Sequence, residues 1–396
     1  MITQARMDGI MRASYGRLLA ILSSRSGDIL RAEDALSDAF AKALIHWPDG
    51  MPKNPEAWLL TVARNRLTDI ARRDARIDFR DELPELADHD DELSDFPDER
   101  LKLMFVCAHP AIDAGIHTPL MLQTVLGLDA QAIAQAFLVP HATMAKRLVR
   151  AKRKIRDTSI AFHIPENGDL IPRLSVVLEA IYGAFSRDWF AAGALAEEAF
   201  YLATLLTDFL PDEAEVRGLA ALMAYTLSRE NARVRNGQFV PLEEQDPTQW
   251  DRRLLDVARM HLTRAQAQNG VARFQLEAAI QAVHADRLYT GVTDWDALVQ
   301  LHLGLSRVAP TIGATVSYAA AVGKAVGPKE GLYVLEAVDP KIHASFAPAE
   351  ATKAYLLSEM GQSQEAVEAY QRAISLTAEQ SLRQYLQAKS AALLAS

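Results

Sequence analysis

Hydrophobic residues recur at helical spacing along almost the whole chain, and the strict alternation of a half-buried strand is nearly absent. Ala and Leu are abundant, and Pro and Gly interrupt the pattern at intervals. The spacing predicts a first helix to about Leu22, a second from about Leu30 to Trp47 and a third from Glu56 to about Ala75. We therefore expect an all-α protein that begins with a small helical bundle.

The helical pattern is interrupted in two places, which divides the chain. One interruption is rich in acidic residues and poor in large apolar ones, as is typical of a flexible linker. The other is rich in helix breakers, and beyond it short helical stretches follow one another. We predict a helical domain over 1–80, the acidic linker over 81–98, a second helical domain over 99–160 and a C-terminal helical domain over 161–396.

The segment from Asp129 to Arg156 predicts two helices around a tight turn. Asp129 is a good N-cap for the first helix, and Pro140 lies where the second would begin. In the second helix one apolar stripe is formed by Met144, Leu148, Ala151 and Ile155. The remaining positions are strongly cationic: Lys146, Arg147, Arg150, Lys152, Arg153, Lys154 and Arg156. A buried stripe under a basic face suits a recognition helix in the DNA major groove, and a solvated basic helix is the alternative.

Two further patches lie in the N-terminal bundle. Over residues 31–47, Asp34, Asp38 and Lys42 share one helix face, which could dock on a basic protein surface or simply be solvated. Over residues 58–76 the polar side chains are largely cationic: Arg64, Asn65, Arg66, Arg72, Arg73 and Arg76. Arginine binds phosphate and asparagine can bond to base edges, so this helix could contact DNA. We expect Trp58 to be a core residue rather than a platform for unstacked bases.

Charge and composition narrow the class of protein. The formal net charge is −9, so the basic segments are islands in an acidic chain, which favours DNA binding with a partner's help. Cys107 is the only cysteine, which excludes an intrachain disulfide and a cysteine-rich zinc site, and we expect it to be a packing residue. No apolar run approaches the roughly 20 residues of a membrane span, and no signal peptide is evident. We expect a cytoplasmic protein without metal or cofactor, and no motif indicates an enzyme.

The C-terminal part contains a segment that resembles a tetratricopeptide (TPR) repeat, AEATKAYLLSEMGQSQEAVEAYQRAISLT. Its small and aromatic packing positions are Ala354, Ala366, Tyr370 and Ala373, and Gly361 falls in the turn between the two helices. Earlier helix pairs keep the rhythm but lose these residues. We expect a degenerate helical-repeat domain, with a plain helical bundle as the alternative.

Three segments in order resemble those of bacterial RNA polymerase sigma factors of the extracytoplasmic-function (ECF) group: RAEDALSDAF, NPEAWLLTVARNRLTDIARR and AIAQAFLVPHATMAKRLVRAKRKI. The C-terminal part resembles the subgroup with a TPR-like domain behind the two sigma domains. Within it, FVPLEEQDPTQWDRRLL and QLEAAIQAVHA resemble that subgroup as well. The resemblance covers essentially the whole chain, and three ordered motifs are more specific than one.

The resemblance implies roles for individual residues. Asp34, Asp38 and Phe40 would engage core RNA polymerase. The −10 promoter element would be contacted by Arg64, Asn65, Arg66, Arg72 and Arg73. The −35 element would be contacted by the basic helix, through His141, Thr143, Lys146, Arg147, Arg150, Lys152 and Arg153.

The expected function is that of a promoter-specificity subunit, whose partners are core RNA polymerase and promoter DNA, with no membrane partner. The C-terminal domain would modulate its activity and could bind an unidentified ligand or protein. The alternative is a stand-alone helix–turn–helix regulator with a TPR effector domain, which would bind DNA without polymerase.

Overall fold

The computed structural model describes residues 4–48, 50–77, 98–165, 167–187, 194–268, 270–337 and 344–395. Over these residues the chain is helical, and its strands are two residues long: β1 (Val234–Arg235) and β2 (Gln238–Phe239), paired antiparallel. The prediction of an all-α fold is confirmed. The chain divides into two compact units, residues 1–205 and 206–396, and each is described by itself.

The first unit begins with the predicted three-helix bundle, α1 (Gln4–Ser26), α2 (Ile29–His46) and α3 (Pro55–Ile77). Asp28 caps α2 by accepting hydrogen bonds from the backbone N–H groups of Leu30 and Arg31. The three helices pack on one another around fully buried leucines, and the buried Trp47 contacts Trp58 edge-on at 5.7 Å between ring centroids. Trp58 itself is half-buried, so the contact packs only part of this predicted core residue against the bundle.

The second group of helices in this unit consists of α4 (Glu99–Cys107), α5 (Ala114–Thr124), α6 (Ala130–Ala136) and α7 (His141–Asp157). It packs directly on the first bundle, mainly through α1 and α4. At the closest approach, a Cβ on Gly16 of α1 would overlap the carbonyl oxygen of Val125 at the end of α5. Cys107 is fully buried, as predicted, and burial raises the pKa of its thiol to about 12.

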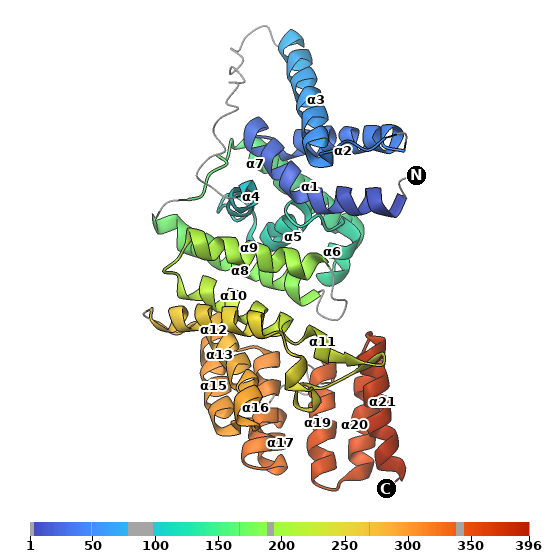
Figure 1. Cartoon of the computed structure of the whole chain (residues 1–396), viewed down its shortest axis with the longest axis vertical. Helices are drawn as coiled ribbons and strands as arrows, with labels where there is room; N and C mark the ends of the chain where they lie inside the picture. The colour runs from blue at the N-terminus through green and yellow to red at the C-terminus, as the bar shows by residue number, and fades with distance from the viewer. Residues whose placement is uncertain are drawn as a thin grey trace. The chain divides into compact units, whose positions relative to one another are not determined.

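Two more helices belong to the first unit, α8 (Leu170–Arg187), preceded by the 3-10 turn η1 (Asn167–Asp169), and α9 (Ala194–Phe209), in which the unit ends. α8 packs against α5 and α4 (Figure 1). The buried Arg100 of α4 pairs with Asp98 and with Glu198 of α9, and its guanidinium lies 5.4 Å from the centre of the Tyr201 ring. The compact unit therefore extends past residue 160, where the sequence predicts a domain boundary, because α8 packs on α5 and α4 and Arg100 of α4 meets two side chains of α9.

The second unit starts with α10 (Ala214–Leu227) and α11 (Glu230–Arg233), followed by the β1–β2 hairpin and the 3-10 turns η2 (Leu242–Glu244) and η3 (Pro247–Gln249). An array of helices follows: α12 (Arg252–Gln266), α13 (Arg273–Ala285), α14 (Arg287–Thr290), α15 (Trp295–Val308), α16 (Ile312–Ala325), α17 (Pro328–Glu336), α19 (Ala347–Glu359), α20 (Ser363–Leu376) and α21 (Gln380–Ala395). Most of them pack on their neighbours in the chain.

The α19–α20 pair contains the small and aromatic positions of the repeat-like segment. Ala354, Ala366, Tyr370 and Ala373 are buried in one core cluster. Gly361 has a φ of +74° in the turn between the helices, a left-handed conformation that glycine adopts without strain.

Candidate nucleic-acid interface

The basic helix α7 has two faces, as its sequence predicts. The stripe of Met144, Leu148, Ala151 and Ile155 is buried, with every member at most 5% exposed. Most of the predicted −35 contacts are exposed to solvent: His141, Thr143, Lys146, Arg147, Arg150 and Arg153. Because no acidic residue lies between them along the helix, this face carries concentrated positive charge, which is the kind of surface that attracts a phosphate backbone.

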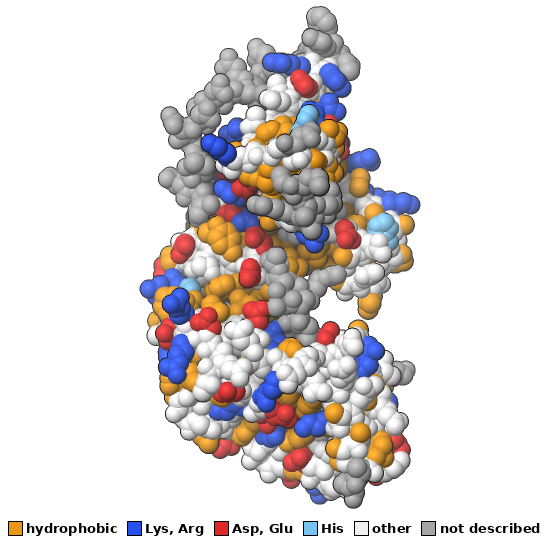
Figure 2. Space-filling view, turned by 45° about the vertical axis from the view of Figure 1, so that its right-hand side comes forward, with side chains coloured by type: hydrophobic (Ala, Val, Ile, Leu, Met, Phe, Trp, Pro, Cys, Tyr) orange, Lys and Arg blue, Asp and Glu red, His pale blue; other side chains and the backbone are white. Residues whose placement is uncertain are grey.

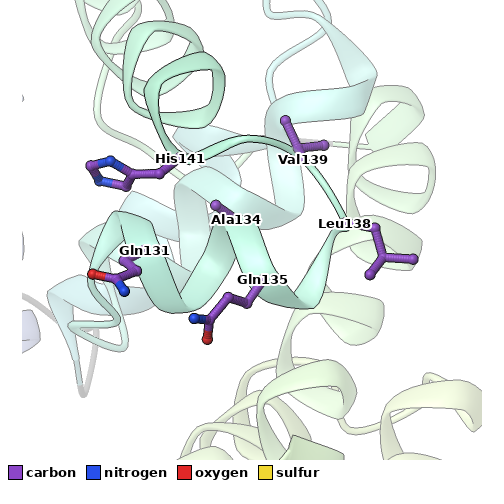
Figure 3. Close-up of a pocket in the computed structure, with 6 residues that line it drawn as sticks. All are labelled: Gln131, Ala134, Gln135, Leu138, Val139 and His141. Carbon is purple, nitrogen blue, oxygen red and sulfur yellow. The ribbon is translucent and has the colours of Figure 1, made fainter. Parts of the chain in front are cut away.

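The turn before α7 brings α6 against the start of the basic helix. Asp129 caps α6, since its Oδ1 accepts a hydrogen bond of 2.7 Å from the backbone N–H of Ala132. An open hollow beside the turn is lined by Gln131, Ala134, Gln135, Leu138, Val139 and His141. Figure 3 shows His141 and Gln131 projecting on the same side of the helix pair, with Leu138 directed away from them. α6 and α7 are thus joined by a short turn, and the side-chain amides of Gln131 and Gln135 line the same hollow as His141 in the first turn of α7.

Lys152 differs from the other predicted −35 contacts. Its side chain is only 4% exposed, and its ammonium pairs with Glu33 of α2. The hydroxyl of Tyr15 on α1 donates to the same Glu33 Oε1 at 3.3 Å. Burial, together with the nearby Glu33 carboxylate, raises the pKa of Tyr15. In this arrangement Lys152 joins α7 to the N-terminal bundle and is not accessible to DNA.

The predicted −10 contacts lie on α3. Asn65, Arg72 and Arg73 are exposed, whereas Arg64 and Arg66 are half-buried. Arg66 forms an ion pair of 2.6 Å with Asp38 of α2, where the sequence predicts a contact with polymerase. The other two predicted polymerase contacts lie on the same helix, Asp34 exposed and Phe40 half-buried. The Asp38–Arg66 pair therefore fixes α2 relative to α3, and both side chains remain partly accessible.

Sequence reasoning did not identify Glu33, Tyr15, Gln131 or Gln135. Glu33 stands beside Asp34 in an acidic helix, and its partner lies 119 positions further along the chain, so no local pattern indicates the pair. The two glutamines are found only once the fold of α6 and α7 is known.

The surface of the protein mixes charges of both signs. On the face drawn in Figure 2, basic side chains occur in separate groups among acidic ones. Among the described residues, no three His, Cys, Asp or Glu side chains come together as metal ligands would. None of the helices in the described ranges combines the length and the hydrophobicity that crossing a membrane requires.

Comparisons with known proteins show which family the chain belongs to. A model of sigma-70 region 2 matches residues 10–77, which include α2 and α3. A model of a family of unknown function, DUF6596, matches residues 173–266. The chain is similar to the uncharacterized protein R00370 of Rhizobium meliloti (strain 1021), with 34% identity over 396 residues and 93% of each chain covered. No solved structure matches the chain. The chain belongs to the same family as R00370, and its sigma-70 region 2 domain indicates a sigma-factor-like role in promoter recognition.

Proposed function

We propose that the chain is a dissociable sigma subunit of the ECF group, which directs core RNA polymerase to a dedicated set of promoters. The observation that supports this most is the two-faced helix α7, with its buried stripe and exposed cations, behind a sigma-70 region 2 domain. A helix of this kind can enter the major groove, while the region 2 domain supplies a second DNA contact.

The residue roles follow from this assignment. Exposed Asn65, Arg72 and Arg73 on α3 would contact the −10 element, together with the half-buried Arg64 and Arg66. Asp34, Asp38 and Phe40 would face core polymerase. The −35 element would be read by the exposed face of α7: His141, Thr143, Lys146, Arg147, Arg150 and Arg153. Lys152 could join this set only after separating from Glu33.

We also propose that the part of the chain behind α7 modulates this activity. The support is that α8 packs on α4 and α5, and that Glu198 of α9 pairs with Arg100 of α4. A change in α8 or α9 would therefore reach the helices that carry the helix–turn–helix.

Run-off transcription with purified core polymerase and host promoters tests the main proposal. The full chain should add promoter-dependent products, and a variant with Lys146, Arg147 and Arg150 all changed to Gln should not. The absence of any promoter-dependent product would contradict the proposal. Tight, specific binding to duplex promoter DNA without polymerase, in a gel-shift assay, would instead favour the stand-alone regulator.

A further inference from the structure

The segment between α11 and α12 lies across helices that come much later in the second unit. We call residues 238–250 the strap; it contains β2 and the turns η2 and η3. β2 packs against α21 (Figure 1). Within the strap, Phe239 contacts Tyr385 of α21 edge-on, at 5.8 Å between ring centroids. The strap thus brings an early part of this unit to its last helix.

Two consecutive carboxylates of the strap are held by lysines from two different helices. Glu243 pairs with Lys324 of α16 at 2.8 Å, and Glu244 pairs with Lys389 of α21 at 3.2 Å. The Lys324 ammonium also lies 4.7 Å from the centre of the Tyr355 ring and 5.8 Å from that of Trp295. The Lys389 ammonium lies 5.3 Å from the Tyr385 ring. Each ammonium therefore lies beside both a carboxylate and at least one aromatic ring.

The backbone of the strap is also held by hydrogen bonds. The Arg287 guanidinium donates hydrogen bonds to the carbonyl oxygens of Leu242, Glu243 and Gln245, at 2.7–2.8 Å. We call Arg287, Trp295, Lys324, Tyr355, Tyr385 and Lys389 together the cradle. Main-chain bonds, an aromatic contact and two charge pairs are the means by which a protein binds an extended peptide.

The two ion pairs lie at the surface. Glu243 and Glu244 are 44% and 54% exposed, and Lys324 and Lys389 are 27% and 44% exposed. Pairs of this kind are individually weak and screened by salt, so they can be exchanged. The strap is anchored separately by the buried Val240, Gln245 and Trp250. The acidic residues could leave the cradle while these anchors stay in the core.

We propose that the cradle is a binding site for an acidic peptide of another protein, which presents an apolar residue followed by two consecutive carboxylates, and that the strap fills this site in its absence. The incoming peptide would take over the two lysines and the Arg287 bonds to the carbonyl oxygens of Leu242 and Glu243, while the bond from Arg287 to Gln245 stays with the anchored part of the strap. Although burial opposes the charge on Lys324, its bonds with Glu243 and Tyr355 raise its pKa, so this ammonium keeps its charge at neutral pH. A tethered strap competes at high effective concentration, which keeps the site closed to weak ligands.

A labelled peptide with the sequence of residues 237–250 tests this by fluorescence anisotropy on the full chain. The variant Glu243→Gln/Glu244→Gln weakens the strap and leaves the cradle intact, so it should bind the peptide about tenfold more tightly than the wild-type chain does. Adding Lys324→Gln/Lys389→Gln should abolish this binding. The exposed Lys329 of α17 lies outside the cradle, so Lys329→Gln is the matched control and should leave the binding unchanged.

A second peptide, with Gln in place of both Glu residues, separates charge recognition from general adhesion and should bind about tenfold more weakly. Circular dichroism of each variant establishes that the helices are intact. The proposal is overturned if the acidic peptide binds neither the wild-type chain nor the strap variant. It is equally overturned if the Gln peptide binds as well as the acidic one, or if the two lysine substitutions have no effect.

Discussion

Neighbouring cations on α7 lie in different environments, because α2 packs along only one edge of the buried stripe. Lys152 is four residues from Leu148 and borders the stripe on the edge that meets Glu33 of α2, whereas Arg147 borders the other edge and Arg150 lies farther round the helix. A lysine at such a border is stable only with a partner, and Glu33 is that partner. For Lys152, the charged side chain indicates a surface position, whereas its place beside the apolar stripe of α7 indicates a buried one.

A substitution at Arg147 is the most direct test of sequence-specific DNA contact. It is exposed and lies in the N-terminal half of α7, the part of a recognition helix that contacts base edges. We expect Arg147→Ala to weaken binding to the preferred −35 sequence by about 1–3 kcal/mol, and binding to scrambled DNA by less.

The exposed Lys154 near the end of the same helix is the control. Lys154→Ala should weaken binding to both DNAs alike, because a phosphate contact carries no sequence information. Competition binding of the reconstituted polymerase measures both variants. An equal loss on both DNAs for Arg147→Ala would identify its contact as phosphate.

Leu138 adopts a strained backbone conformation in the turn before α7. Its φ is +52°, and its side chain is 93% exposed, so it gains little burial in return. Leu138→Gly should therefore stabilise the first unit by about 1 kcal/mol. Leu138→Ala keeps the strain and should leave the free energy of unfolding nearly unchanged. Urea denaturation distinguishes the two, and equal stability of both variants would show that the turn is not strained.

At the scale of elements, a largely buried charge pair, Lys152 with Glu33, joins α7 to α2. Glu33→Gln leaves the Lys152 ammonium buried without its counter-charge, which should cost about 3 kcal/mol of unfolding free energy. Replacing both groups by apolar ones, as in Glu33→Leu/Lys152→Met, should cost only about 1 kcal/mol, since no charge is stranded. If the single and the double variant lose the same stability by denaturant titration, the pair does not join these helices.

Sequence patterns predicted the helices well and their long-range contacts poorly. The first three helices begin and end within a few residues of their predicted bounds, and the stripe of α7 is buried as expected, because both follow from local spacing. The approach of Gly16 to Val125, the Glu33–Lys152 pair and the packing of α8 on α5 join positions far apart in the sequence. Periodicity indicates which face of a helix is apolar but not which helix covers it.

At the scale of the molecule, buried histidines make the second unit sensitive to acid. Burial lowers the pKa of His302 to about 4, and His261 has a pKa lowered to about 4 by burial and nearby arginines. In the unfolded chain histidine titrates near pH 6.5, so the unfolded state binds more protons between these two values. The free energy of unfolding should therefore fall as the pH drops from about 6.5 to about 4.

Each of these histidines would contribute up to about 3 kcal/mol to that fall. His302→Leu removes one titrating group and should make the pH dependence shallower by that amount. Denaturant titrations of both proteins at a series of pH values measure the difference. Parallel curves for the wild-type chain and the variant would contradict a buried, neutral His302.

The extent of the first unit determines which fragment of the chain should fold with the proposed promoter-binding helices. α8 buries Leu174, Val177, Leu178 and Ile181, and a fully buried side chain of this size contributes about 1.5–3 kcal/mol. A fragment of residues 1–209 keeps α8 and all of α9, with the Arg100–Glu198 pair, and should unfold cooperatively on its own. A fragment of residues 1–165 exposes the faces of α4 and α5 that α8 covers, so it should be less stable by roughly 5 kcal/mol or more, or should aggregate.

Transcription assays on the same two fragments separate folding from regulation. If the second unit modulates promoter use, the fragment 1–209 should bind core polymerase and differ from the full chain in promoter output, because it is folded but lacks that unit. Output equal to that of the full chain would leave the second unit without a role in initiation. Equal stability of the two fragments would instead put the domain boundary near residue 160, where the sequence alone places it. In that case α8 and α9 would be separable from α4 and α5.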